Sequence, residues 1–421
     1  MRISSSFYFQ TGVNTINKQE SDLLHLFQQI GSGRRMLTPA DDPLAAAQAI
    51  TLSQSQSMNQ RFADNREVAL RALAETENVL GSMVDQMVAV KSRLIEAGNG
   101  TLSDQDRAVL AQVLSESRTS LLGSMNATDA SGKYLFSGSK ADTPAFTTLD
   151  GGYQYAGDVG QQARRSVQVD HTRVLDVGNT GSEVFMRAAP GTSAFVQGGG
   201  QHNQGQAVIG TMSIHDGALA QPVHALELLY EESADAGAGW RVVVRDSSGV
   251  LDERFFPAVE GGVQHIDLRA NFGLSFSLTG AAEAGDQFSY QSVQQLNGTD
   301  ELNVLNALSA AIEALNTPIK GDPVAQAQLQ NSLNRALQVV DISYDNLLTT
   351  QATIGTRMNE IESLNDSGSL QSLQLAKELS RLEDVDYYTA TSQLSLRKMA
   401  LEAASMAFMK IQGTSLFSMS K

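Results

Sequence analysis

The chain has 421 residues, enough for about two to four domains with sizeable cores. Its 46 acidic and 30 basic side chains give a net charge of −16, which argues against a nucleic-acid-binding protein because phosphate binding needs clustered Lys and Arg. Cysteine is absent, and this excludes disulfide frameworks, thiolate nucleophiles and Cys-ligated zinc or iron.

The first helix expected from the sequence lies near the N-terminus. Apolar side chains recur every three or four residues from Val13 to Ile30, which predicts a short amphipathic helix. Gly31-Ser32-Gly33 follows, as is typical of a helix C-cap. The segment Asp41-Asp42-Pro43 then predicts an N-cap and a first helical turn, rather than a metal site or an acid pair.

A long helix is expected next. No proline occurs from Leu44 to about Ala97, and apolar side chains recur at every seventh residue from Leu73 to Leu94. Ser103, followed by acidic residues, predicts the start of another helix. The two helices would form an antiparallel hairpin.

The C-terminal third repeats this helical pattern. Leu302 to Leu315 predicts one helix, and Leu333 to Ile361 keeps a heptad spacing that predicts another. The segment Asp366-Ser367-Gly368-Ser369 predicts a break or kink. The last helix is expected from about Leu370 to Ile411.

Residues 150–296 differ from both helical arms. Short alternating or β-branched stretches, such as Trp240 to Val244 and Phe272 to Leu278, predict β-strands separated by turns. The net charge of this block is −9, against −2 for residues 1–149 and −5 for residues 297–421. The glycine-rich segment 198–205 predicts a flexible linker, and a division near 192–206 would give two small β units.

These patterns predict an α+β fold. The N- and C-terminal arms would form a long antiparallel heptad-type helical bundle with a β-rich central insert. The expected divisions are 1–40 with 386–421 as a terminal helical polymerisation region, 41–149 with 297–385 as a helical rod domain, and 150–296 as a β-rich outer insert.

The sequence offers little to support an enzyme. The segment Gly31 to Met36 lacks the third glycine of a dinucleotide fingerprint and follows no expected strand. The six histidines are scattered, and the acidic residues from Glu383 to Asp386 would point in different directions on a helix. We therefore expect no catalytic residue, no cofactor and no metal.

The terminal helices carry the strongest functional signal. They have apolar seams, but a pair of such helices would bury too little surface to fold well alone. We expect them to gain order by packing against neighbouring subunits in a polymer or ring. The residues expected at the subunit interface are Val13, Ile16, Leu23, Phe27, Ile30, Leu396, Met399, Met406 and Phe408.

Several motifs resemble those of the flagellin superfamily. They include Arg2-Ile3-Ser4 and Gly33-Arg34-Arg35, and the segments 132–140 and 285–288 resemble more specifically the members that join the flagellar hook to the filament. The resemblance covers about residues 1–190 and 284–421, whereas residues 192–283 match nothing that we can assign. The chain also lacks the aromatic-leucine tail that is common in the family. The motif residues are Asp41, Asp42, Pro43, Phe136, Ser137, Gly138, Gly285, Asp286 and Phe288.

The resemblance implies a structural protein of the bacterial flagellum. Such relatives are exported unfolded through the flagellar type III apparatus with a dedicated export chaperone. They self-associate in a ring that meets hook-associated protein 1 on one side and flagellin on the other. The chain would then be extracellular, with no nucleic acid and no membrane insertion. The N-terminus lacks the apolar run of a secretory signal, which fits this route.

Two alternatives remain at this stage. A flagellin-type filament subunit would share the architecture, although the segments 134–140 and 285–288 favour a junction role. An extracellular adhesin or glycan-binding module on the insert is the other alternative, because Trp240 and the acidic side chains could line a groove.

Overall fold

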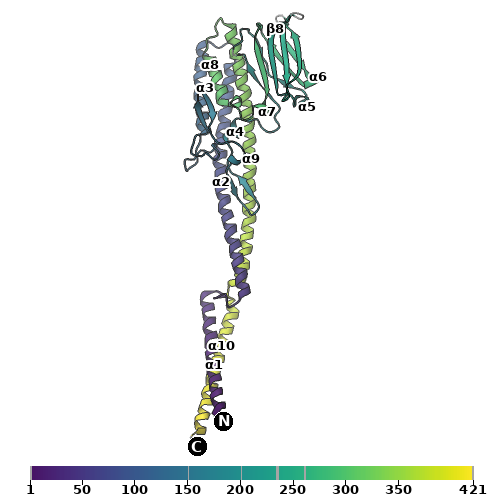
Figure 1. Cartoon of the computed structure of the whole chain (residues 1–421). Helices are drawn as coiled ribbons and strands as arrows, with labels where there is room; N and C mark the ends of the chain where they lie inside the picture. Colours follow the sequence, from purple (N-terminus) through teal and green to yellow (C-terminus); the bar gives the residue numbers. More distant parts are fainter. Residues whose placement is uncertain (1, 150, 201, 234–236, 260–261, 420–421) are drawn as a thin grey trace. The chain divides into compact units, whose positions relative to one another are not determined.

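A computed structural model describes residues 2–149, 151–200, 202–233, 237–259 and 262–419, and the chain divides into two compact units. Unit 1 contains Met1–Asn65 and Ser363–Lys421, and unit 2 contains Arg66–Glu362. The long helices α2 (Pro43–Ala97) and α9 (Pro323–Glu383) each contribute to both units (Figure 1). The three-part division expected from the sequence stays a prediction. The side chains of Arg2-Ile3-Ser4 and of residues 411–421 lie outside the described part.

Unit 1 is built from α1 (Arg2–Ser32), α10 (Tyr387–Met419) and the adjoining ends of α2 and α9. Helices α1 and α10 pack side by side (Figure 1). The Phe408 ring lies directly on Gly12, where a Cβ atom would come within 2.8 Å of the ring. Its centroid is 5.2 Å from that of Phe9. An ion pair between Asp22 and Arg397 joins the same two helices.

The apolar core of unit 1 is small. Among its described residues, the buried hydrophobic side chains are Leu26, Ala45, Ala49, Phe62 and Ala390. Three of these five are alanines, which bury little area. The packing of α1 on α10 therefore leaves much of their apolar surface uncovered.

The predicted C-cap at the end of α1 is confirmed. Gly33 has φ of 70°, a left-handed conformation that glycine adopts without a steric cost. The residues after it then pair antiparallel with the segment between α9 and α10. Arg35 N donates to Glu383 O at 2.6 Å, and Val385 N donates to Gly33 O at 2.9 Å. This short pairing joins the connection between α1 and α2 to the connection between α9 and α10.

The break predicted at 366–369 is wrong, and so is the start of the last helix predicted near Leu370. Helix α9 continues through this segment to Glu383, and the change to α10 occurs at residues 384–386. A single glycine inside a helix costs only about 1 kcal/mol. On the adjacent α2, the buried Asn59 amide donates to Gly368 O at 2.7 Å. Packing against α2 therefore keeps the helix continuous.

The helical part of unit 2 contains α3 (Asp104–Met125) and α8 (Val304–Asn316), packed on each other beside parts of α2 and α9. The seven-residue repeat predicted in α2 is buried from Leu73 to Leu94, and the repeat in α9 is buried from Leu333 to Ile361. Ser103 forms the capping box predicted at the start of α3. The heptad patterns thus mark the core of this unit.

Two β-hairpins follow the first helices of unit 2. Strand β1 (Phe146–Leu149) pairs with β2 (Gly152–Tyr155), and β3 (Ser166–Gln168) pairs with β4 (Val174–Asp176). The short helices around them are η1 (Gln161–Ala163) and α4 (Gly181–Phe185).

Two antiparallel sheets then pack face to face around one apolar core (Figure 1). The five-stranded sheet has the order β10 (Val250–Pro257), β9 (Gly237–Arg245), β8 (Ala225–Ser233), β13 (Gln287–Ser292) and β5 (Phe195–Gly199). The other sheet has the order β11 (Gln264–Leu268), β12 (Leu274–Thr279) and β6 (Val208–Ile209), with β7 (Ser213–Ile214) also paired to β12. Short helices accompany these strands: α5 (Gly217–Ala220) lies between β7 and β8, α6 (Arg269–Phe272) lies between β11 and β12, and α7 (Val293–Leu296) and η2 (Asp300–Leu302) follow β13. The predicted α+β fold with a β-rich insert is confirmed.

The flexible linker predicted at 198–205 is wrong for its described residues. Gly198 and Gly199 belong to β5. The buried Asn203 donates to Gln287 O at 3.1 Å and accepts from Gln287 N at 2.9 Å. These bonds anchor the segment to β13, so it is part of the sandwich rather than a spacer.

Candidate subunit interface

Unit 1 carries a large share of the exposed apolar surface. About half of the exposed large hydrophobic side chains among the described residues lie in unit 1, which has less than a third of the chain. On α10, Leu396, Met399 and Met406 are 60%, 57% and 62% exposed. Their spacing places them on one face of the helix. We call this set, together with Met409, the α10 stripe.

The nine residues predicted at the interface fall into two groups. Phe27 on α1 is 54% exposed, and Leu396, Met399 and Met406 belong to the exposed α10 stripe. The others are half-buried within unit 1: Val13, Ile16, Leu23, Ile30 and Phe408. For Phe408 the contacts are with Gly12 and Phe9 of the same chain. The first group is therefore available to another molecule, and its role at a subunit interface stays a prediction.

Some exposed apolar residues were missed by the sequence analysis. Leu24 is exposed three residues before Phe27, and Leu370 and Leu373 are exposed near the end of α9. Tyr388, at the start of α10, is 86% exposed. The i, i+3 spacing of Leu24 with Phe27, and of Leu370 with Leu373, was a usable signal. It was hidden because the heptad pattern assigned most of the apolar residues to an internal core.

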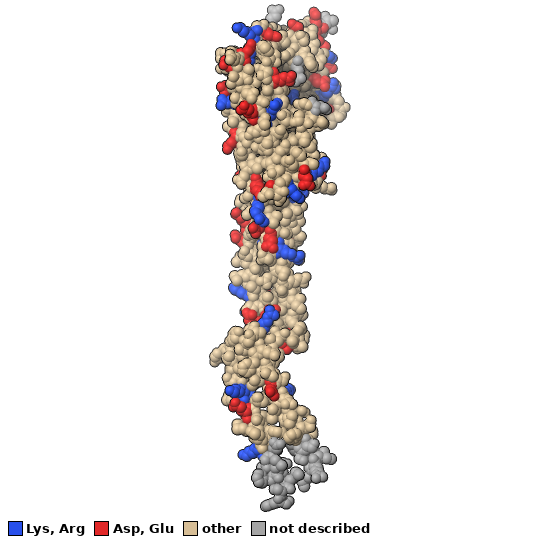
Figure 2. Space-filling model, turned by 90° about the vertical axis from the view of Figure 1, so that its left-hand side faces the viewer, with Lys and Arg blue, Asp and Glu red and all other residues tan. Residues whose placement is uncertain are grey.

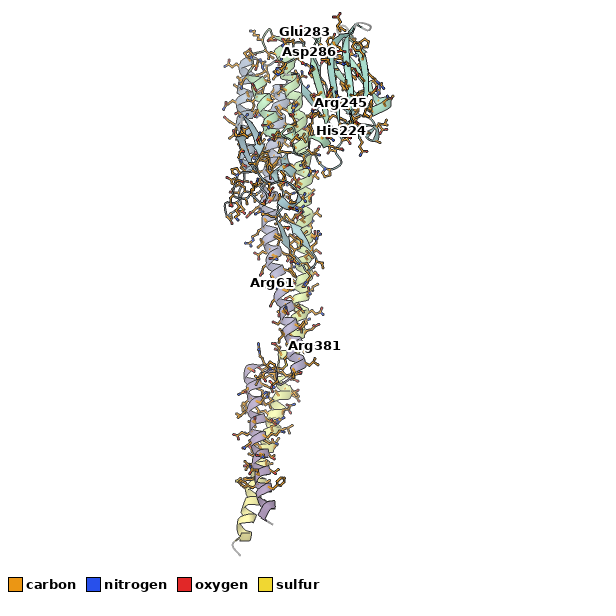
Figure 3. The ribbon with its side chains drawn as sticks, in the orientation of Figure 1. Arg61, His224, Arg245, Glu283, Asp286 and Arg381 are labelled. Carbon is orange, nitrogen blue, oxygen red and sulfur yellow. The ribbon has the colours of Figure 1, made fainter. Side chains whose placement is uncertain are left out.

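A groove of about 550 Å³ lies within unit 1, between the first turns of α2 and the last turns of α9. Leu52 and Leu382 contribute apolar walls, and Glu378 and Arg381 contribute charge (Figure 3 labels Arg381). The groove adds to the apolar surface of unit 1.

The turn between α1 and α2 is held by Asp41. Its Oδ2 accepts from Thr38 N at 2.9 Å and from Leu37 N at 2.8 Å, and its Oδ1 lies 3.2 Å from His25 Nε2. These hydrogen bonds, those from the main-chain amides of Thr38 and Leu37 first, hold the pKa of Asp41 below its usual range. Asp42 Oδ1 accepts from Ala45 N at 3.0 Å and caps α2, as the sequence predicted.

We expect the Asp41→Asn variant to show how the Asp41 carboxylate stabilises the fold, through the pH dependence of its melting temperature. The pKa of Asp41 is lower in the folded chain than in the unfolded chain, so its stabilisation is complete above the unfolded value of about 3.9. It is lost as the pH falls through the folded value. The variant should therefore melt below the wild type at pH 6, and the difference should shrink toward pH 3, as followed by circular dichroism. An equal difference at both pH values would contradict this role.

The motif Phe136-Ser137-Gly138 ties a loop to the first hairpin and to α4. Phe136 is fully buried, and its ring packs edge-on against Phe185 with centroids 5.0 Å apart. Phe136 O accepts from Gly181 N at 2.7 Å and from Tyr155 Oη at 2.9 Å. Burial raises the pKa of the Tyr155 hydroxyl to about 12, so it stays a hydrogen-bond donor. The motif therefore has a structural role: it joins this loop, the first hairpin and α4 within unit 2.

The motif 285–288 holds separate segments of the sandwich together (Figure 3 labels Glu283 and Asp286). The carboxylate of Asp286 is buried and accepts from the main-chain N–H groups of Gln204, Gly205 and Glu283 at 2.9, 3.2 and 3.0 Å. Gly205 has no room for a side chain, because a Cβ atom would lie 2.2 Å from Asp286 Oδ2. Phe288 is buried in the sandwich core near Trp240.

In the described part of the chain, the His, Asp and Glu residues form no cluster of three or more that could hold a metal ion. None of the helices searched there is both long and apolar enough to cross a membrane. On the face drawn in Figure 2, acidic and basic side chains are interspersed.

The alternative in which Trp240 lines a groove is wrong for this residue. Trp240 is 3% exposed, and its ring packs against Tyr230 and Phe288 with centroids 5.1 and 5.8 Å away. It belongs to the core of the sandwich because it points inward from β9. The tryptophan therefore gives no support to a glycan-binding surface.

Comparisons with known proteins show that this chain is similar to flagellar proteins. The family models for the bacterial flagellin N-terminal and C-terminal helical regions match residues 3–141 and 337–419. The chain is 26% identical to flagellar hook-associated protein 3 of Salmonella typhimurium and 27% identical to that of Escherichia coli, over the full length of each pair. The crystal structure of the flagellar junction protein FlgL from Legionella pneumophila is 26% identical, with a TM-score of 0.59, and the match covers 80% of this chain and 100% of that one.

Proposed function

The chain belongs to the bacterial flagellin superfamily, and from that premise we propose that it joins the hook to the filament of the bacterial flagellum. Its full-length relatives are named flagellar hook-associated protein 3, and a similar solved structure is a flagellar junction protein. The observation that carries the proposal is the exposed apolar face of α1 and α10, in a unit whose own core is small. A large exposed apolar face of this kind is typical of a surface that binds another molecule.

The proposed assembly is a closed ring of copies of this chain. In it, the α10 stripe of one subunit packs against terminal helices of the next, and the heterologous contact closes by rotation. Full burial of a Leu, Met or Phe side chain contributes about 1.5 to 3 kcal/mol. Leu396, Met399, Met406 and Phe27 could therefore supply a substantial part of the association free energy.

The proposed partners are hook-associated protein 1 on the hook side and flagellin on the filament side. Flagellin is supported as a partner because this chain matches its N- and C-terminal helical regions, so both chains offer the same kind of apolar helix pair. The insert carries most of the net negative charge and would face outward, where mutual repulsion keeps the surface hydrated.

We also propose export in an unfolded state through the flagellar type III apparatus, with a dedicated chaperone, to an extracellular position. The absence of cysteine supports this, because no disulfide has to form or be broken around export. The proposed role is mechanical, and it needs no catalytic residue, cofactor or metal.

Deleting the gene tests the junction role against the filament alternative. We expect the deleted strain to keep its hooks, to lose its filaments and to release flagellin monomers into the medium. A filament subunit would behave differently, because its deletion would remove flagellin from the medium as well. Electron microscopy of the cells and immunoblots of the medium distinguish these outcomes. Filaments of normal length in the deleted strain would contradict both roles.

A further inference from the structure

The exposed methionines of the described chain are confined to one face of one helix. Met399, Met406 and Met409 are 57%, 62% and 59% exposed, and all three lie on α10. The methionines of unit 2 are buried or half-buried, with Met83, Met87 and Met125 fully enclosed in its helical core. In unit 1, Met36 and Met58 are half-buried, and the Met58 sulfur accepts from Arg61, which Figure 3 labels.

The lack of cysteine makes these thioethers the first targets of oxidants. With no thiol in the chain, methionine sulfur is the side-chain atom most readily oxidised by peroxide. Reaction follows exposure, so the sulfur atoms of the α10 stripe should react well before those in the core of unit 2. We propose that Met399, Met406 and Met409 form an oxidation site whose conversion to methionine sulfoxide prevents the subunit from assembling. This rests on the proposed function, because it takes the α10 stripe as an assembly surface.

The chemistry needs only hydrogen peroxide. The methionine sulfur attacks one peroxide oxygen, a sulfur–oxygen bond forms and the oxygen–oxygen bond breaks. The sulfur is oxidised by two electrons, and the peroxide is reduced to one molecule of water. Each event adds one oxygen atom to the side chain and leaves the charge of the chain unchanged.

Oxidation makes the α10 stripe more polar, and assembly would bury this stripe. A sulfoxide oxygen is a strong hydrogen-bond acceptor that water satisfies in the free subunit. Burial against an apolar partner would leave that oxygen without a donor. The monomer should therefore tolerate the change, whereas association should weaken. Once the ring has formed, the same sulfur atoms would be covered, so the site acts on subunits before assembly.

The test uses the purified full-length chain and hooks isolated from a strain that lacks it. The chain is treated with hydrogen peroxide, oxidation of each methionine is measured by peptide mass spectrometry, and the amount bound to sedimented hooks is measured by immunoblot. We expect Met399, Met406 and Met409 to be oxidised before Met83, Met87 and Met125. Binding should then fall at least about tenfold, and methionine sulfoxide reductase should restore it.

Two variants control the assignment. The triple variant Met399→Leu, Met406→Leu and Met409→Leu keeps the apolar face and should bind equally well before and after peroxide. The matched variant Met36→Leu with Met58→Leu keeps the α10 stripe and should lose binding on treatment like the wild type. The inference would be overturned if the oxidised wild type bound hooks as well as the untreated wild type does. It would also be overturned if peroxide reduced binding of the triple variant as much as it reduces binding of the wild type. Failure of the untreated wild type to bind hooks would instead overturn the proposed function.

Discussion

Replacing Phe27 by Asp should abolish incorporation into the flagellum while the chain still folds. Phe27 is 54% exposed on α1, so the free chain loses little apolar contact, and surface changes of this kind usually alter stability by less than about 0.5 kcal/mol. In the assembled state the substituted carboxylate would be buried without a partner. That costs several kcal/mol, so we expect association to weaken by about a hundredfold or more.

The measurement is complementation of the deleted strain. Swimming on soft agar and filament length in electron micrographs report assembly, and circular dichroism of the purified variant reports folding. Val250→Asp is a matched control, because Val250 is equally exposed, at 53%, but lies on the edge strand β10 of the insert. The control should swim normally. Normal swimming of the Phe27→Asp strain would refute the role of this face.

Much of the helical architecture was predictable because its determinants are local. The seven-residue repeat from Leu73 to Leu94 marks a buried face from spacing alone. Ser103 with Asp106, and Gly33 after α1, are capping signals that act within a few residues. Such features depend on neighbouring residues in the chain, and the structure reproduces them.

The errors arose where distant contacts override local preference. Asp366-Ser367-Gly368-Ser369 has turn chemistry, yet α9 stays helical there because it packs on α2 and Asn59 bonds Gly368 O. The composition of the glycine-rich segment 198–205 predicts a linker, yet hydrogen bonds of Asn203 and Asp286 anchor the segment to the sandwich. In both cases the deciding partner lies more than 80 residues away in the sequence.

The candidate interface was only partly predictable for a related reason. A heptad pattern identifies apolar faces, but it does not tell which face meets the same chain and which meets another molecule. On α10 the row with Phe408 faces α1, and the row with Leu396 and Met399 is exposed. Gly12 was the available clue, because a glycine inside a helix allows a ring to lie against the backbone.

The Asp286→Ala variant should destabilise the sandwich strongly. The buried Asp286 carboxylate accepts three main-chain N–H groups from two separate segments. Without it the buried N–H of Gly205 and the part-buried N–H groups of Gln204 and Glu283 would lose their acceptor, and hydrogen bonds to a charged group contribute about 1.5 to 3 kcal/mol each. Allowing for partial rescue by water, we expect a loss of roughly 3 to 5 kcal/mol in the free energy of unfolding of this part of the chain.

Thermal unfolding and hydrogen exchange would measure that loss. Amides of residues 195–292 should exchange faster in Asp286→Ala, whereas the core of α2 and α9 should keep its protection. Asp267→Ala is the matched control from the same sandwich: Arg269 lowers the pKa of the exposed Asp267 to about 2, but water replaces that contact easily. Its effect should be much smaller despite the large pKa shift. Equal effects of the two variants would mean that burial of the carboxylate does not decide its contribution, and the structural role assigned to Asp286 would be wrong.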